Sequence, residues 1–98
     1  MHKALLLLKK VPKGKVTSYG ELAKVTNSSP RAIGRVMRTN TDPKNCPCYK
    51  VIKSSGEIGG YNGRIKGRNM RKKIRLLKKD GIKIENGRIA RKYFYRFR

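Results

Sequence analysis

The sequence has 98 residues, of which 27 are Lys or Arg and 5 are Asp or Glu, so its formal net charge is +22 at pH 7. This length suits one domain, 1–98, and no apolar run approaches the ~20 residues that a membrane span needs. So large an excess of positive charge favours a polyanionic partner, with nucleic acid first and a membrane surface as the alternative.

The N-terminal third predicts two short helices separated by a turn. Residues 2–11 show the spacing of a short amphipathic helix. Residues 12–15, Pro-Lys-Gly-Lys, are typical of a turn. Ser18 and Glu21 stand three apart, as in a capping box, and predict a second helix that runs to about Val25.

A third predicted helix begins at Pro30, with Ser29 as its N-cap. Apolar residues at helical spacing would face the core: Ile33, Val36 and Met37. Arginines at i, i+4 and i+7 form a separate stripe: Arg31, Arg35 and Arg38. The small residues Ala32 and Gly34 allow close approach of a partner. Two short helices with a basic stripe on the second predict a helix-turn-helix, and a solvated arginine face is the alternative.

The rest of the chain predicts a loop, a basic helix and a hairpin. Residues 43–63 are rich in Pro, Gly, Ser and Asn, and 54–60 resemble a β-turn that could form a wing. More than half of residues 64–79 are Lys or Arg, with Ile74 and Leu77 as apolar anchors and Gly81 as the helix end. Asn86-Gly87 predicts a hairpin. The fold class is therefore mainly α with small β: a winged helix-turn-helix-like domain with a short C-terminal hairpin.

The C-terminal segment mixes cations with four aromatic residues: Tyr93, Phe94, Tyr95 and Phe97. Aromatic rings beside cations suit either packing in the core or stacking on nucleic-acid bases. The sequence leaves these two uses open. We expect the cations of this segment to contact phosphates.

The two cysteines, Cys46 and Cys48, are too few for a disulfide framework and indicate a reducing compartment with a free thiol. Pro47 restricts the backbone before Cys48. A thiol among so many cations favours its thiolate form, whereas most free cysteines are simply small buried hydrophobes. A zinc site would need four ligands, and His2 with the two cysteines falls short. We therefore expect no metal and no cofactor.

Five motifs occur in order along the chain: residues 16–23 (VTSYGELA), 31–34 (RAIG), Asn40, 47–51 (PCYKV) and 54–61 (SSGEIGGY). Their order and spacing resemble the C-terminal DNA-binding and active-site domain of the O6-alkylguanine-DNA alkyltransferases. The resemblance covers roughly residues 3–81. We expect the chain to lack the N-terminal domain of longer family members, as in the shortest relatives.

The resemblance implies DNA repair by base flipping, because a damaged base inside a duplex is otherwise out of reach. In the family the helix-turn-helix docks in the minor groove. Arg31 matches the arginine that fills the vacated stack, and Tyr19 matches the tyrosine that rotates the nucleotide and binds the base. Cys48 matches the thiol that takes the alkyl group irreversibly, so each molecule would act once.

Further positions receive roles from the same resemblance. Val51 matches a residue whose backbone carbonyl contacts the base. Met37 matches a residue in the wall of the base pocket, and Asn40 matches a residue that supports the active-site loop. Asn62 replaces a small residue whose backbone N–H reaches the guanine oxygen. The remaining DNA-binding positions are Ala32, Gly34, Arg35, Arg38 and Lys50.

Three positions depart from the family pattern. Tyr49 stands where the family usually has the His that acts as base through water, and a phenol of pKa about 10 is a poor base at neutral pH. Asp80 stands for the Glu that orients this His, so its partner is either Tyr49 or a neighbouring lysine. Lys50 replaces an Arg and loses the bidentate fork. We place Cys48, Tyr49 and Asp80 in the catalytic group.

We expect a single-turnover methyltransferase that acts on double-stranded DNA containing O6-alkylguanine, as a cytoplasmic, nucleoid-associated monomer without membrane contact. The first alternative is an alkyltransferase-like protein that binds the lesion and recruits other repair. Such relatives lack the acceptor cysteine, whereas this chain has Cys48. A purely architectural nucleic-acid binder is the second alternative, but it leaves the spacing of Tyr19, Arg31 and Cys48 without a reason.

Overall fold

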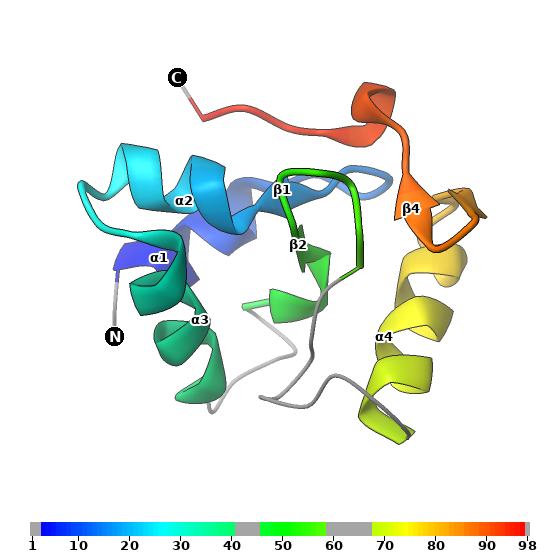
Figure 1. Cartoon of the computed structure of the whole chain (residues 1–98), viewed down its shortest axis with the longest axis horizontal. Coiled ribbons are helices and arrows are strands. Elements are labelled where there is room, and N and C mark those ends of the chain that lie inside the picture. The colour runs from blue at the N-terminus through cyan, green and yellow to red at the C-terminus, as the bar shows by residue number, and fades with distance from the viewer. Residues whose placement is uncertain (1–2, 41–45, 59–67, 98) are drawn as a thin grey trace.

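The computed structural model describes residues 3–40, 46–58 and 68–97, with side chains of the last segment described from residue 71. The first described segment contains α1 (Lys3–Leu7), η1 (Leu8–Lys10), β1 (Thr17–Ser18), α2 (Tyr19–Val25) and α3 (Pro30–Arg38). The other two contain η2 (Cys48–Lys50), β2 (Val51–Ile52), α4 (Arg68–Lys79), β3 (Ile84–Glu85), β4 (Arg88–Ile89) and η3 (Arg91–Tyr93). Helices α1 to α3 gather on one side and α4 lies on the other, with β1 and β2 between them (Figure 1).

The predicted helix-turn-helix is confirmed in α2 and α3. The Ser18 hydroxyl accepts the N–H of Glu21 at 3.0 Å, and the Ser29 hydroxyl accepts the N–H of Ala32 at 3.2 Å. Each hydroxyl satisfies a helix N–H that has no partner within the helix. The capping box is only half formed, because the Glu21 carboxylate accepts the N–H of Phe97 at 3.1 Å instead.

A parallel pair of strands joins the N-terminal helices to the segment that carries Cys48. Thr17 pairs with Val51 and Ser18 pairs with Ile52. The sequence predicted a loop in this region and no strand pairing. Because Val51 and Ile52 directly follow η2, the pairing holds the Cys48 segment next to the start of α2.

Two clusters of buried residues lie on either side of the β1–β2 pair. One packs under α1, α2 and α3, and its buried residues are Ala4, Leu5, Leu8, Leu22, Ala23, Ile33, Met37, Cys46, Cys48 and Val51. The other lies toward α4 and the hairpin, and its buried residues are Val16, Ile52, Ile58, Leu77, Ile82 and Ile89. Val51 and Ile52 belong to different clusters, since neighbouring strand residues point to opposite faces.

The end of α4 and the hairpin form as predicted. Gly81 has φ +86°, its N–H donates to the carbonyl of Lys78 at 2.9 Å, and the Ile82 N–H donates to the carbonyl of Leu77 at 3.1 Å. This is the glycine helix end that the sequence indicates. Asn86 and Gly87 have φ +52° and +74°, the left-handed backbone of a tight hairpin turn between β3 and β4.

The C-terminal segment packs along the body instead of projecting from it. The Val16 N–H donates to the carbonyl of Tyr93 at 2.8 Å, and the Tyr95 N–H donates to the carbonyl of Val16 at 2.7 Å. The rings of Tyr95 and Phe97 meet edge to face with centroids 5.3 Å apart. All four aromatic side chains of this segment are half-buried, so packing is the use that the structure favours.

No described helix is both long enough and apolar enough to cross a membrane.

Candidate nucleic-acid interface and thiol site

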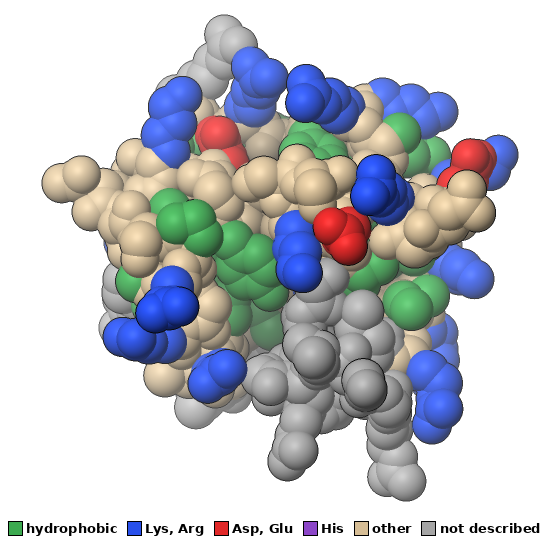
Figure 2. Space-filling view, viewed as in Figure 1, with side chains coloured by type: hydrophobic (Ala, Val, Ile, Leu, Met, Phe, Trp, Pro, Cys, Tyr) green, Lys and Arg blue, Asp and Glu red, His purple; other side chains and the backbone are tan. Residues whose placement is uncertain are grey.

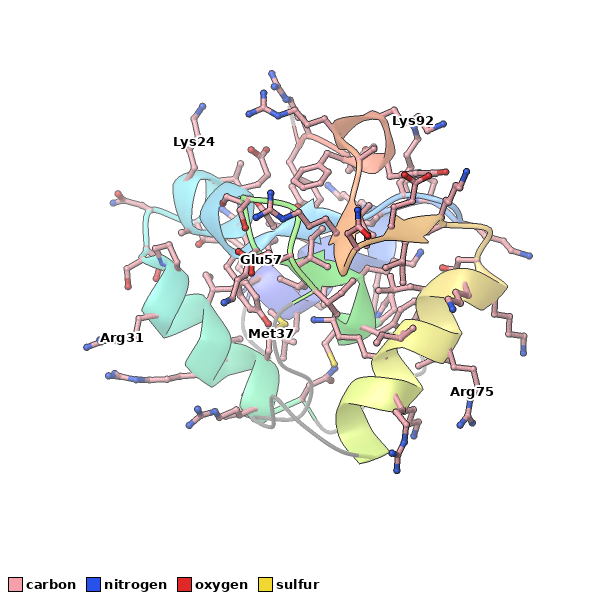
Figure 3. All side chains as sticks on the ribbon, turned by 45° about the vertical axis from the view of Figure 1, so that its right-hand side comes forward. Lys24, Arg31, Met37, Glu57, Arg75 and Lys92 are labelled. Carbon is pink, nitrogen blue, oxygen red and sulfur yellow. The ribbon has the colours of Figure 1, made fainter. Side chains whose placement is uncertain are left out.

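Helix α3 presents its arginine stripe outward. Arg31, Arg35 and Arg38 are exposed, whereas Ile33 and Met37 on the same helix are 0% and 7% exposed. Arg31 points away from the molecule and Met37 points inward (Figure 3). A side chain added at Gly34 would meet no atom within 4 Å, so the backbone there is open to a partner. The helix can therefore lie close to a negatively charged surface.

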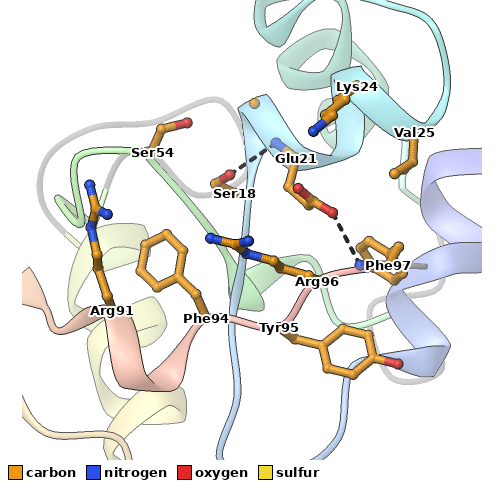
Figure 4. A pocket seen from close by; sticks show the side chains of 11 residues that line it. Ser18, Glu21, Lys24, Val25, Ser54, Arg91, Phe94, Tyr95, Arg96 and Phe97 are labelled. Carbon is orange, nitrogen blue, oxygen red and sulfur yellow. Dashed lines mark hydrogen bonds between the residues drawn. The ribbon is translucent and has the colours of Figure 1, made fainter.

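Positive charge extends beyond α3. Basic side chains spread over the visible face of the molecule, with few acidic ones between them (Figure 2). A groove between α2 and the C-terminal segment adds to this charge: Lys24, Arg91 and Arg96 line it with Ser18 and Ser54 (Figure 4). Sequence reasoning did not predict this groove, because its two sides are far apart in the chain.

Cys48 begins η2 and is buried, with 4% of its surface exposed. Neither Cys46 nor Cys48 is in a disulfide. The Cys48 N–H donates to the carbonyl of Cys46 at 2.8 Å, and the Asn40 side-chain amide donates to the same carbonyl at 2.7 Å. The residue predicted to support the active-site loop thus bonds directly to the turn before the thiol.

Tyr49 and Asp80 are in contact, although they lie far apart in the sequence. The Tyr49 hydroxyl donates to Asp80 Oδ2 at 2.6 Å, and the same oxygen lies 3.8 Å from Lys50 Nζ. Of the two partners that the sequence left open for Asp80, the structure shows Tyr49, and the lysine that contacts Asp80 is Lys50 of η2 rather than a sequence neighbour in α4. Because the phenolic proton is directed at the carboxylate, Tyr49 is held as a donor to Asp80.

Lys50 is a correction to the predicted DNA-binding surface. Its side chain is only 8% exposed, and its Nζ donates to the carbonyls of Val11 and Pro12 at 3.0 and 3.3 Å. Burial lowers the pKa of Lys50, and the nearby Asp80 carboxylate opposes this shift. The Lys50 ammonium group holds the turn after η1 against η2.

Lys73 on α4 is a buried site residue that sequence reasoning missed. It is 0% exposed, and its Nζ donates to the carbonyl of Val51 at 2.6 Å and lies 6.0 Å from the ring centroid of Tyr19. Burial lowers the pKa of Lys73 to about 7, against the opposing effect of Cys48. A signal was available: Lys73 precedes Leu77 by four residues and so shares its inward face.

Tyr19 completes this cluster from the first turn of α2. Burial raises its pKa, and the charge of Cys48 raises it further. Tyr19 packs against the core cluster that contains Met37, Cys48 and Val51. The structure thus brings four predicted substrate and catalytic positions together. Asn62 lies outside the described residues. Among those that are described, no three His, Cys, Asp or Glu side chains group as metal ligands.

The chain matches a family model described as 6-O-methylguanine DNA methyltransferase, DNA binding domain, over residues 1–82. A bifunctional methyltransferase/endonuclease of Picrophilus torridus is 47% identical over 93 residues, which are 93% of this chain and 29% of that protein. A methylated-DNA–protein-cysteine methyltransferase of Thermococcus sibiricus is 44% identical over 77 residues, 79% of this chain and 41% of the relative. The chain therefore spans less than half the length of these relatives.

Solved structures show the same fold. The O6-methylguanine-DNA methyltransferase of Pyrococcus kodakaraensis superposes with a TM-score of 0.69 and 40% identity, covering 82% of this chain and 44% of that chain. Schizosaccharomyces pombe Atl1, in complex with damaged DNA containing O6-carboxymethylguanine, superposes with a TM-score of 0.82, covering 97% and 93%. Its 22% identity supports the fold alone.

Proposed function

The chain belongs to the family of the 6-O-methylguanine DNA methyltransferase DNA-binding domain, and from this premise we propose that it repairs DNA by taking the alkyl group of O6-alkylguanine onto Cys48. The observation that carries the proposal is a free, buried thiol in one cluster with Tyr19, Met37 and Val51. Such a thiol is poised to meet a base that has left the duplex.

The outward face of α3 would supply the binding step. Arg31 projects from the first turn of α3 and would occupy the space that the flipped nucleotide leaves. Ala32 and Gly34 would allow the backbone to approach the DNA, and Arg35 and Arg38 would contact phosphates. These phosphate contacts replace condensed counterions, so binding should weaken with salt.

The buried cluster would supply the chemistry. Tyr19 would bind the flipped base, with Met37 as a pocket wall and the Val51 carbonyl as a further contact. In-line attack by the Cys48 thiolate forms a sulfur–carbon bond as the carbon–O6 bond breaks, and the electron pair stays on guanine. Asn40 and the Tyr49–Asp80 pair act as positioning residues for η2, through the bonds described above.

A second candidate is a protein that binds the lesion without repairing it. The bond from Tyr49 to Asp80 favours this candidate, because a phenol already donating to a carboxylate gives no relay of the kind that the family's His provides. The retained thiol favours repair. The two candidates share the same binding surface and differ only in what happens at Cys48.

The deciding experiment incubates the protein with duplex DNA carrying one O6-methylguanine and measures the intact protein mass. We expect the mass of one methyl group to appear on Cys48 and not on a Cys48→Ser variant. Peptide mapping separates Cys48 from Cys46. Selective binding of the lesion duplex with no mass gain by the wild-type protein would reject the transferase and support the second candidate.

A further inference from the structure

The Cys48 thiol has a buried amine close by that the proposed chemistry does not yet use. Lys73 reaches across from α4, and its Nζ is bonded to the carbonyl of Val51, three residues after Cys48. The same Nζ lies over the Tyr19 ring. Helix α4 packs directly against η2, which carries the thiol at its first residue. Thiol, amine and phenol thus come together from η2, α4 and α2.

We propose that Lys73 is the proton acceptor for Cys48, in the place of the histidine that this chain lacks beside its thiol. This inference rests on the proposed function of Cys48. Lys73 is fully enclosed, and its Nζ already has a fixed position through the bond to Val51. A general base must be near the proton that it removes and must be uncharged beforehand, and burial supplies the second condition.

The protons of this reaction balance with no reactant other than solvent. The neutral Lys73 amine takes the thiol proton, which leaves a thiolate beside an ammonium ion. The thiolate forms the sulfur–carbon bond, the carbon–O6 bond breaks, and its electron pair remains on guanine. Guanine then regains one proton from solvent as Lys73 releases one. The products are the alkylated cysteine, neutral guanine and a neutral amine.

Electrostatics at Lys73 agree with this role. Burial holds its pKa at about 7, and the charge of Cys48 acts in the opposite direction. Tyr19 faces the amine from α2 and Cys48 acts on it from η2. Lys50 of η2 pairs with Asp80, the residue after α4, and Asp80 also accepts the Tyr49 hydroxyl. A lysine that is half neutral at pH 7 can accept a proton under cellular conditions.

The first test is a titration of the free protein with lysines labelled at Cε, followed by NMR. We expect one lysine, identified by its absence in Lys73→Arg, to titrate near pH 7. In Cys48→Ser its titration should move to lower pH, because the thiolate no longer favours the ammonium form. An inflection near the ordinary lysine value of about 10.4, or one that Cys48→Ser leaves unchanged, would overturn the proposal. This test needs no DNA and no active transferase.

The second test measures single-turnover methyl transfer from duplex DNA containing O6-methylguanine across pH. The wild-type rate should rise through about pH 7 and then level off. Lys73→Met should lower the rate at neutral pH by roughly 100-fold or more. Its remaining rate should lack the inflection near pH 7. Lys72→Met, which removes the same charge at the exposed neighbouring position, should keep the wild-type profile.

Lys73→Arg separates a proton acceptor from a fixed charge. Arginine keeps a positive charge and stays protonated in a protein, so it cannot accept the thiol proton. The transfer rate of Lys73→Arg should therefore fall as in Lys73→Met. Wild-type activity in Lys73→Arg, or a wild-type pH profile in Lys73→Met, would refute Lys73 as the acceptor. Absence of transfer by the wild-type protein at every pH would instead reject the proposed function, and the titration would still decide whether amine and thiol are coupled.

Discussion

The exposed arginines of α3 and the buried lysines behind Cys48 carry the same charge in opposite environments. Arg31, Arg35 and Arg38 stand in solvent, whereas Lys50 and Lys73 are 6% and 0% exposed. An exposed cation keeps its hydration and is available to phosphates. A buried cation has lost its hydration, so it must find carbonyl or carboxylate partners or give up its proton.

The two buried lysines compensate for their lost hydration in different ways. Lys50 has the Asp80 carboxylate within 3.8 Å and two backbone carbonyls as acceptors. Lys73 bonds to the Val51 carbonyl, and burial is the dominant influence on its pKa, which falls to about 7. Lys50 is therefore a structural cation, and Lys73 is the one able to change its protonation state near neutral pH.

The largest effect should come from removing the structural cation. Lys50→Ala removes the cation beside Asp80 and the donor to the carbonyls of Val11 and Pro12, so we expect the free energy of unfolding to fall by about 3 kcal/mol. Urea denaturation measures this value. Lys53→Ala is the matched control, since Lys53 is exposed and its loss should cost less than about 0.5 kcal/mol. Equal costs would show that Lys50 is not structural.

Lys73 should make stability depend on pH. Its pKa is about 7 in the folded chain and about 10.4 in the unfolded chain, so the unfolded chain binds more protons between these values. The free energy of unfolding should therefore rise with pH, by about 2 kcal/mol from pH 7 to pH 9, and this contribution should become flat below about pH 6. Denaturation of the wild-type protein and of Lys73→Met across pH isolates the contribution of Lys73. A Lys73→Met curve parallel to the wild type would contradict it.

Arg31→Ala should separate flipping from chemistry. We expect transfer from O6-methylguanine in duplex DNA to slow by about 10-fold, equivalent to about 1.4 kcal/mol, because nothing stabilises the vacated stack. Transfer from the free base, measured by the same mass assay, should change little. Equal losses on both substrates would show that Arg31 does not assist flipping.

The smallest effect should belong to a single phosphate contact. Arg35→Ala should weaken binding to lesion-free and lesion-containing duplexes equally and reduce the salt slope of binding by about 1. Fluorescence anisotropy over a range of salt concentrations measures that slope. Lys50→Arg, which keeps a buried cation, should leave the slope as it is in the wild type. A lower slope in Lys50→Arg would return Lys50 to the DNA-binding surface.

Much of the local fold was predictable because its signals act over a few residues. Ser18 and Ser29 cap their helices through bonds to residues three positions later. Asn86 and Gly87 adopt the left-handed backbone that their dipeptide predicts. The capping prediction failed only at Glu21, because its carboxylate accepts the N–H of the distant residue Phe97.

The candidate site was predictable as a set of positions more than as a set of contacts. Asn40 does bond to the turn before Cys48, and Tyr49 does meet Asp80. Sequence spacing could not show that Lys50 turns inward or that Lys73 lies beside Tyr19. Lys73 stands in a stretch rich in basic residues, where composition indicates exposure.

The sequence by itself determined the helix starts, the hairpin turn, the arginine stripe and the free thiol, because each follows from side chains within a turn or two of one another. Only the tertiary structure decided which cations face solvent and which are buried. The sign of a charge belongs to its side chain, but its hydration and pKa depend on the residues that the fold packs around it, such as Asp80 near Lys50 and Cys48 near Lys73.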